Sequence, residues 1–407
     1  MANDIVVIGA GISGLAFAAH ASRAGRDVLL LEEREGVGGS LATRGGPGSF
    51  WIELGAHTCY NSYGAFIELL EMLGLMDELQ PRGKPVLRFL DGDEVVPGTN
   101  MRALLGRMKM WQLIKALPGA FRASPQGQSV RAHYSRLVGA ENYQRALSPM
   151  LTAVPSQPAD DLPADMLFKK RARRKDVIRS FTLRGGLASV AGAVARLPRV
   201  TVATGRRALR VSAAGAGYRV ETAGGGHEDA ELVVLAAPPL ATSRLLADVA
   251  PAAAQLAETL REATVDSTGV VVRSGRSPLP YATFFIPLAD RFYSVVTRDV
   301  VPDPEWRGFV FHFRPGASLD DRLDRIVRVL RVPRGDLELA VELRQTVPSP
   351  VVGHAATIAG IDRALAGKPI AVTGNWFGGL ALEDCALRAR AEWERLAAPS
   401  LRSALVA

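Results

Sequence analysis

The sequence predicts an α/β fold in which a parallel-sheet domain, built from three separate stretches of chain, carries an inserted α+β domain. A strand–turn–helix–strand pattern occupies residues 4–33. Residues 69–195 read as mostly helical, and short strand-like runs separated by glycine turns follow them. The end of the chain returns to strand, glycine turn and helix. The parallel-sheet domain is predicted to comprise residues 1–75, 181–255 and 350–407. The inserted domain is predicted to comprise residues 76–180 and 256–349, and residues 76–180 form its helical part.

Composition limits the class of protein. The chain has 407 residues, 48% of them apolar, so two globular domains are expected. Its two cysteines, Cys59 and Cys385, cannot form a disulfide framework, which fits a reducing, cytoplasmic location. The six histidines are scattered without ligand spacing, so no metal site is predicted. No stretch is apolar over the ~18 residues that a membrane-spanning helix needs.

The N-terminal apolar run reads as a βαβ unit rather than as a signal peptide, because it carries an early acidic residue and glycines at turn spacing. Ile5–Ile8 form the first predicted strand, which Gly9 ends. Apolar residues at helical spacing predict a helix over Ile12–Ala24, and Val28–Leu31 form the second strand. That strand ends at the acidic pair Glu32-Glu33.

Three glycines follow the first strand in the spacing Gly9-x-Gly11-x-x-Gly14. The first allows a tight turn, the second lets a pyrophosphate approach the backbone, and the third permits close helix–strand packing. The helix N-terminus then presents unpaired N–H groups to the phosphates. Glu32, at the end of the second strand, can accept hydrogen bonds from both ribose hydroxyls and would repel a 2′-phosphate. The combination predicts a Rossmann-type dinucleotide site; the alternative is a glycine-rich turn without a ligand.

A second glycine pair, Gly38-Gly39, follows Glu32 closely, and a simple NAD-binding domain does not need it. The stretch from Glu32 to this pair resembles the FAD-binding signature of the flavin amine oxidase superfamily. The resemblance implies FAD as the cofactor. It also implies a glutathione-reductase-like FAD-binding domain with an inserted substrate domain.

The stretch "FWIELGAHTCY" resembles the segment that lies beneath the isoalloxazine ring in that superfamily. The resemblance places four consecutive residues in contact positions: Gly55, Ala56, His57 and Thr58. His57 would polarise the flavin or the substrate, or it would be a loop histidine that only packs. The sequence leaves both interpretations open.

The stretch "GNWFGGLALEDC", Gly374–Cys385, leads into the last predicted helix. In the superfamily this helix begins at the pyrimidine edge of the flavin, where its dipole stabilises the negative charge of the reduced ring. Gly379, Leu380 and Ala381 would then lie against the ring, and the charges of Glu383 and Asp384 suit the start of this helix. A glycine-rich loop without a ligand is the alternative. Amine oxidases use a lysine near the flavin, and the sequence does not show which lysine that would be.

The same stretch resembles protoporphyrinogen oxidases, as do "SFTLRGGLASVAGAVARL" and the helical segment that begins "VRAHYSRLVGAENY". The resemblance implies FAD-dependent oxidation of protoporphyrinogen or coproporphyrinogen to a porphyrin, in tetrapyrrole and heme biosynthesis. It also places Arg102 where an arginine would clamp a propionate. A solvated helix arginine is the alternative. No catalytic residue beyond the flavin is identified.

Two other functions stay open at this point. Carotenoid and polyene desaturases share the dinucleotide motifs, and Ser40 stands where many superfamily members have arginine or another larger residue. A non-catalytic flavin-binding protein is the other alternative. Substrate-dependent reduction of a bound flavin would separate it from either enzyme.

The predicted cofactor-binding set joins these segments to Ala208 and Ala237 in the strand-rich middle section. Its members are Gly9, Ala10, Gly11, Ile12, Ser13, Gly14, Glu32, Glu33, Gly38, Gly39, Ser40, Gly55, Ala56, His57, Thr58, Ala208, Ala237, Gly374, Gly379, Leu380, Ala381 and Leu382.

A basic run and the net charge of +8 favour anionic partners. Six of the seven residues from 169 to 175 are basic: Lys169, Lys170, Arg171, Arg173, Arg174 and Lys175. A solvated surface is one explanation, and peripheral attachment to an anionic membrane is the other. Nucleic-acid binding is not predicted, because no aromatic platform or recognition helix accompanies the charge. The oligomeric state and the electron acceptor do not follow from the sequence.

Overall fold

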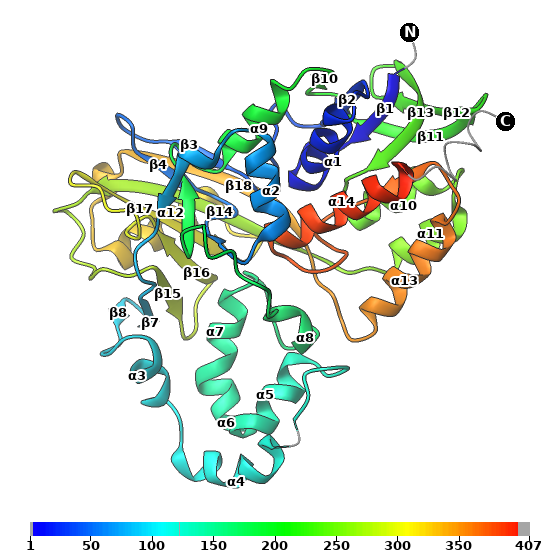
Figure 1. Ribbon diagram of the computed structural model, residues 1–407. Coiled ribbons are helices and arrows are strands. Elements are labelled where there is room, and N and C mark those ends of the chain that lie inside the picture. The colour runs from blue at the N-terminus through cyan, green and yellow to red at the C-terminus, as the bar shows by residue number, and fades with distance from the viewer. Residues whose placement is uncertain (1–2, 122, 398–407) are drawn as a thin grey trace.

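The computed structural model describes residues 3–121 and 123–397, so the last ten residues of the stretch 350–407 lie outside the described part. Figure 1 shows one large sheet at the upper right, a second at the left, and a lobe of short helices at the bottom. The α/β fold that the sequence predicts is confirmed. Where one domain ends and the next begins along the chain stays a prediction.

The first sheet contains the N-terminal βαβ unit. Its parallel strands occur in the order β10, β2, β1, β13, with β19 pairing the last half of β13 and an antiparallel hairpin pairing the first half. The strands are β1 (Asn3–Ile8), β2 (Val28–Leu31), β10 (Val200–Ala203), β11 (Ala208–Ala214), β12 (Gly217–Thr222), β13 (His227–Leu235) and β19 (Ile370–Val372). The carboxyl ends of the central strands therefore meet at one edge, where open α/β sheets bind ligands.

Both faces of the first sheet are buried, which explains why its strands are apolar almost throughout. Ile5 and Val7 face one core, and Val6 and Ile8 face the other. The first core is covered by α1 (Ile12–Arg23), α2 (Gly64–Met72), α9 (Ala188–Ala195) and α14 (Leu382–Ala397). The second is covered by α10 (Pro239–Leu246), α11 (Pro251–Glu258) and α13 (His354–Leu365).

The second sheet is antiparallel apart from one pair, and it has the order β18, β14, β17, β16, β15, β7, β8. Its strands are β7 (Leu87–Asp91), β8 (Glu94–Val95), β14 (Glu262–Arg273), β15 (Phe284–Pro287), β16 (Phe292–Thr297), β17 (Trp306–Phe313) and β18 (Leu339–Pro348). Helix α12 (Leu319–Leu330) packs its apolar residues on one face, and Ser318 and Asp321 form a capping box at its start. The short helix η3 (Arg334–Asp336) leads into β18.

The prediction that residues 76–180 are helical is partly wrong. The short helices α3–α8 occupy residues 100–167, but η1 (Met76–Glu78), β6 (Leu79–Pro81), β7 and β8 precede them. Gly92 makes the β7–β8 turn with a φ of +59°, and this hairpin extends the second sheet. The helices are α3 (Asn100–Leu105), α4 (Met110–Ala120), α5 (Val130–Val138), α6 (Ala140–Asn142), the π-helix η2 (Tyr143–Leu147), α7 (Ser148–Ala153) and α8 (Ala164–Leu167).

Two small sheets join the large parts. β3 (Thr43–Gly45) pairs with β4 (Trp51–Glu53), and β9 (Ser180–Leu183) pairs with β5 (Cys59–Tyr60) and β6. The apolar side chains of the β4 region share a core with β14 and β17 of the second sheet. This junction sets the predicted flavin segment, residues 55–58, beside the second sheet. Within the described residues, no helix is long and apolar enough to cross a membrane.

Candidate functional site

The loop after β1 has the form that a dinucleotide cradle requires. Gly9 has a φ of +104°, and a Cβ there would lie 2.6 Å from the carbonyl oxygen of Ala236. A Cβ on Gly14 would lie 2.0 Å from the carbonyl oxygen of Gly9, so only glycine lets α1 pack this close. A Cβ on Gly11, in contrast, would meet nothing within 4 Å. The open space in front of Gly11 is where a pyrophosphate would approach the backbone.

The N-terminus of α1 is free to bind an anion. Gly11 is its N-cap residue and provides no side-chain cap, and no acidic residue lies in the first turn. The first N–H groups of a helix need partners from outside it, and the helix dipole favours a negative one. These residues therefore fit the phosphates of a dinucleotide such as FAD.

Glu32 closes the other side of this loop. One of its carboxylate oxygens accepts a hydrogen bond from the N–H of Ala10 at 2.9 Å, and the other accepts from the N–H of Arg34 at 3.0 Å. Each oxygen keeps a second lone pair for a ribose hydroxyl. Glu33, its neighbour, is exposed and lies 4.0 Å from Arg207.

Replacing Glu32 should weaken FAD binding. Glu32→Ala removes charge-assisted hydrogen bonds to ribose, each worth about 1.5–3 kcal/mol, so the Kd for FAD should rise about 10- to 100-fold. Glu32→Gln keeps one oxygen for Ala10 and should show a smaller rise. Fluorescence titration of the apoprotein with FAD measures both, with Glu35→Ala as an exposed control. An unchanged Kd in Glu32→Ala would remove this residue from the site.

The second glycine pair packs directly on the first loop. The N–H of Gly38 donates to the carbonyl of Ala10 at 2.8 Å, and a Cβ on Gly39 would lie 3.1 Å from the Cα of Gly11. The chain then passes Gly55, where a Cβ would lie 2.2 Å from the carbonyl oxygen of Ser40. The structure thus brings three of the predicted segments into one continuous backbone surface.

The remaining predicted residues lie at different distances from this surface. The carbonyl of Ala237 accepts from the indole N–H of Trp376 at 3.0 Å, and a Cβ on Gly374 would strike the same indole at 2.5 Å. Ala237 also follows Ala236, which touches Gly9. Ala208 begins β11, away from the glycine loops along the chain of strands. Its role stays a prediction.

The C-terminal glycine turn is filled by side chains that the sequence did not assign to it. A Cβ on Gly379 would lie 2.5 Å from a carboxylate oxygen of Asp384 and 3.2 Å from the Nζ of Lys169. Lys169 donates to the carbonyl of Gly378 and lies 3.1 Å from Asp384, and Arg171 lies 2.8 Å from the same carboxylate. A lysine therefore does reach the turn predicted to face the flavin.

Both acidic residues lie in the first turn of α14, as their charge predicts, but their side chains bind different partners. Asp384 accepts from the N–H of Ala381 at 3.3 Å, so it serves its own helix start as well as the two cations. Glu383 instead accepts from the N–H groups of Ala65 and Phe66, at 3.2 and 3.0 Å, and so caps α2. Glu383 therefore lies in the first turn of its own helix, as expected, while its side chain caps a neighbouring helix. Burial raises the pKa of Glu383.

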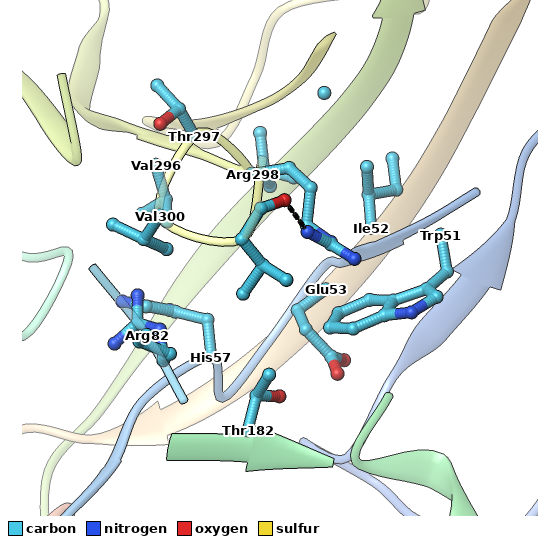
Figure 2. Close-up of a pocket in the computed structure, with 13 residues that line it drawn as sticks. Trp51, Ile52, Glu53, His57, Arg82, Thr182, Val296, Thr297, Arg298 and Val300 are labelled. Atoms are coloured by element: carbon cyan, nitrogen blue, oxygen red, sulfur yellow. Dashed lines mark hydrogen bonds between the residues drawn. The ribbon is translucent and has the colours of Figure 1, made fainter. Parts of the chain in front are cut away.

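A pocket lined by charged residues lies at the junction of the two large parts (Figure 2). One wall of the pocket consists of Trp51, Ile52 and Glu53 on β4 and Thr182 on β9. The opposite wall is formed by β16, β17 and the loop between them. The remaining polar lining residues are His57, Arg82 and Arg298. His57 stacks edge-on against Phe284 with ring centres 5.7 Å apart, and its Nδ1 lies 3.1 Å from the carbonyl of Gly55. His57 thus connects the pocket to the segment predicted to contact the flavin.

Burial controls the charges in this pocket. It raises the pKa of Glu53 to about 7, although the N–H of Leu187 at 2.7 Å and the hydroxyl of Thr43 at 2.9 Å bind the ionised form. It lowers the pKa of His57 to about 3, and the charge of Arg82 acts in the same direction, so this imidazole is neutral. It also lowers the pKa of Arg298 to about 10.

The raised pKa of Glu53 predicts a pH dependence of stability. The folded protein keeps this proton up to about pH 7, whereas the unfolded chain loses it near pH 4.5. The resulting stabilisation is complete below pH 4.5 and is lost as the pH rises to about 7. Relative to Glu53→Gln, which does not titrate, the wild-type free energy of unfolding should fall by about 2–3 kcal/mol between pH 5 and 8. Urea unfolding of both proteins across this range measures the difference, and a constant difference would contradict a buried, titrating Glu53.

The sequence did not indicate Glu53, Arg82, Arg298 or Thr182 as site residues. Each is a single polar residue in an otherwise ordinary stretch, and only Glu53, between Ile52 and Leu54, is a charge between apolar residues. Arg102, in contrast, is exposed on α3, and its side chain makes none of the hydrogen bonds or ion pairs found in residues 3–121 and 123–397. The structure does not place it in the pocket of Figure 2.

Comparison with known proteins identifies the family. Residues 12–272 match the flavin containing amine oxidoreductase family. Among curated proteins, 15-cis-phytoene desaturase of Narcissus pseudonarcissus is 36% identical over 77 residues, which are 19% of this chain and 14% of that enzyme. A provisionally assigned flavin-containing monoamine oxidase of Mycobacterium tuberculosis is 27% identical over 264 residues, 58% of this chain and 57% of that one.

Among solved structures, a provisionally assigned protoporphyrinogen oxidase from Exiguobacterium sp. 255-15 has a TM-score of 0.78 at 20% identity, and the match covers 97% of this chain and 98% of that one. Putrescine oxidase with bound putrescine has a TM-score of 0.64 at 18% identity, covering 97% and 98%. These likenesses show the fold. The family match extends over more than half of the chain, and the glycine loops and Glu32 fit the cofactor of that family. The chain belongs to the flavin containing amine oxidoreductase family.

Proposed function

We propose that this protein oxidises a porphyrinogen, with protoporphyrinogen as the first choice and coproporphyrinogen as the second, to the corresponding porphyrin. The observation that carries the proposal is the likeness in fold to the Exiguobacterium protein, which extends over both sheets and the helical lobe. The stretch Gly374–Cys385, which resembles protoporphyrinogen oxidases, supports it. Membership of an oxidoreductase family argues against the non-catalytic alternative.

The chemistry follows from the cofactor and the place given to it. FAD, when bound, accepts a hydride from the substrate. The chain's own part is to hold the cofactor on the loops around Gly9–Gly14 and Gly38–Gly39, to present residues 55–58 to the reacting ring, and to exclude water. The backbone turn at Gly378–Gly379, with Lys169 beside it, would favour negative charge at the pyrimidine edge. No acid–base pair is required from the protein.

A porphyrin-release assay tests the proposal. Holoprotein and protoporphyrinogen should give fluorescent porphyrin faster than a heat-killed sample, both in air and in an anaerobic arm supplied with an artificial electron acceptor. The acceptor is needed because forming a porphyrin removes more electrons than one bound FAD accepts. The anaerobic arm excludes the oxidation that porphyrinogens undergo in air without an enzyme. Coproporphyrinogen provides the comparison substrate. A rate equal to that of the heat-killed sample with both substrates would refute porphyrinogen oxidation.

Polyene desaturation is the second candidate, and the match to phytoene desaturases favours it. The aligned stretch of the Narcissus enzyme is 14% of its length, so the activity of the whole relative does not transfer by identity alone. Phytoene serves as its probe. Bleaching of the bound flavin by phytoene, together with failure of both porphyrinogens, would replace the first candidate with the second.

The basic run supports membrane attachment only in part. Lys169 and Arg171 pair with Asp384, and Arg174 lies 2.7 Å from Glu71. The three residues that stay exposed, with no ion pair found in the described ranges, are Lys170, Arg173 and Lys175. We infer that these three would contact an anionic surface, each contributing about 1 kcal/mol.

Replacing all three exposed cations by glutamine should move the protein from the pellet to the supernatant in vesicle sedimentation. Vesicles rich in an anionic lipid should show the shift, added salt should reproduce it in the wild-type protein, and neutral vesicles should bind neither form. The unfolding temperature should stay unchanged, because these side chains make no internal ion pair. If the wild type binds anionic and neutral vesicles equally, the basic run is explained as a solvated surface and not as a membrane-binding site.

A further inference from the structure

We propose that Arg82 and Arg298 form the binding site for an ionised carboxylate of the substrate, in the pocket of Figure 2. The inference rests on the proposed function in one respect, namely that the substrate is oxidised at a flavin beside His57. It differs from the sequence-based expectation, which gave this role to Arg102. The site needs an anion for reasons of charge, of unused hydrogen-bond donors and of position.

The charges of Arg82 and Arg298 are not paired within the protein. Neither guanidinium has a carboxylate oxygen within 4.0 Å among residues 3–121 and 123–397, although both side chains are partly buried. Buried and half-buried arginines elsewhere in the chain do have one: Arg307 lies 2.6 Å from Asp299, Arg322 2.6 Å from Glu342, and Arg325 2.7 Å from Asp290. A desolvated cation without a counter-charge is costly, so an anionic ligand is the natural partner.

Hydrogen-bond donors in the pocket are also unused. The Nε of Arg298 and the hydroxyl of Thr182 are buried and have no hydrogen-bond partner in the described part of the chain. Arg298 donates from one Nη to the carbonyl of Val301, drawn in Figure 2, and Arg82 donates to the hydroxyl of Thr58. Buried polar groups are normally satisfied, so an acceptor brought by a ligand would complete this set.

The acid that lines the pocket does not replace this ligand. Both carboxylate oxygens of Glu53 accept hydrogen bonds, one from the N–H of Leu187 and one from the hydroxyl of Thr43, and neither pairs with an arginine. Burial raises the pKa of Glu53 to about 7, so this carboxyl group is only partly ionised at neutral pH. Its negative charge therefore balances only part of the positive charge of the two arginines. Asp303 attracts Arg298 from beyond ion-pair distance, and the imidazole of His57 is neutral. The pocket is therefore positive.

The chemistry of the walls suits a carboxylate on an apolar stem, although the enclosed space is only about 20 Å³, so the side chains must move apart to admit more than the head group. The guanidinium of Arg298 lies over the ring of Trp51 at 4.0 Å, which fixes its plane, and Figure 2 shows it extending toward that ring. A planar guanidinium matches a planar carboxylate. Valines line the opposite wall: Val296, Val300, Val301 and Val310. They suit the methylenes next to a carboxylate better than a hydrated phosphate. A ligand anchored here would point its other end past His57, toward the predicted flavin.

A pair of acid and ester ligands tests this directly on the FAD-bound protein. The probes are protoporphyrin IX with its dimethyl ester, and decanoate with methyl decanoate, followed by the change in the visible flavin spectrum. The wild type should bind each acid about 10- to 100-fold more tightly than its ester. Arg82→Gln and Arg298→Gln should lose that preference and keep their ester affinity. Arg298→Lys should restore part of the preference, because it restores the charge.

Two other arginines serve as controls. Arg273 also stacks on a tryptophan, Trp306, at 4.6 Å, but outside the pocket, so Arg273→Gln should keep the full preference for the acids. Loss of the preference in Arg102→Ala instead of the pocket variants would overturn the proposal, as would equal affinity of the wild type for acid and ester. Tighter binding of decyl phosphate than of decanoate would overturn the carboxylate assignment.

Porphyrinogen turnover is scored separately. If the wild type oxidises no porphyrinogen but the acid preference is present and depends on both arginines, the proposed function fails and the carboxylate site stands. If porphyrinogens are oxidised and the pocket variants keep the wild-type preference for acid over ester, the proposed function stands and the carboxylate site fails.

Discussion

Gly11→Val should leave a folded protein that no longer retains FAD. A Cβ at Gly11 meets nothing within 4 Å, and its φ of −75° is accessible to valine, so the substitution costs only about 1 kcal/mol through the weaker N-cap. The methyl groups would, however, occupy the space through which a pyrophosphate approaches α1. We expect the Kd for FAD to rise by roughly 100-fold or more, as loss of several phosphate hydrogen bonds implies.

Gly36→Val is the matched control, because a Cβ at Gly36 also meets nothing within 4 Å and the residue lies outside both glycine loops. FAD fluorescence titration and circular dichroism of each apoprotein separate binding from folding. Gly14→Val should behave differently from Gly11→Val, since its Cβ would overlap the carbonyl of Gly9 and unfold the loop itself. Wild-type affinity of Gly11→Val for FAD would contradict the placement of the pyrophosphate.

Gly379→Asp should reduce turnover strongly whichever substrate is correct. The residue has a φ of +153°, which other residues rarely adopt, and its Cβ would lie 2.5 Å from Asp384. The new carboxylate would stand beside an existing one and compete for Lys169. It would also oppose negative charge on the reduced flavin at the helix start, where removing one stabilising group typically costs about 100-fold or more in rate.

Gly379→Asn separates strain from charge in that experiment. The two side chains are nearly isosteric, so both variants carry the backbone strain, but only Gly379→Asp adds a negative charge. We expect Gly379→Asp to turn over at least about ten times more slowly than Gly379→Asn, and to have a lower flavin reduction potential. Equal rates and equal potentials would show that no charge develops near this turn.

The sequence predicted the cofactor cradle because its residues are local and their chemistry is specific. Gly9, Gly11 and Gly14 lie close together in the sequence, and Glu32 follows the adjacent strand. Gly9 and Gly14 have a steric reason to lack a side chain, whereas Gly11 leaves the space in front of it open for a pyrophosphate. The pocket could not be found in this way. Glu53, Arg82 and Arg298 come from three distant stretches, and the pairing of strands in the small and large sheets brings them together.

One local error and one contact that the sequence does not indicate have physical causes as well. The β7–β8 hairpin was assigned to a helical region, although an Asp-Gly turn between apolar runs, Asp91-Gly92, is a hairpin signal. Glu383 lies in the first turn of α14, where a carboxylate is favourable, as the sequence predicts. Its side chain reaches Ala65 and Phe66, more than 300 residues earlier in the chain, and no local rule identifies such a partner.

Anaerobic mixing of the FAD-bound protein with a stoichiometric amount of protoporphyrinogen tests the central claim most directly. The proposed function predicts that the visible absorbance of the oxidised flavin is lost in step with the consumption of the porphyrinogen, and that admitting a suitable acceptor restores it. The Gly11→Val apoprotein, mixed with free FAD at the concentration present in the wild-type sample, should show no such change. Flavin absorbance that stays constant in the wild type after the protoporphyrinogen is added would contradict oxidation of this substrate at the flavin.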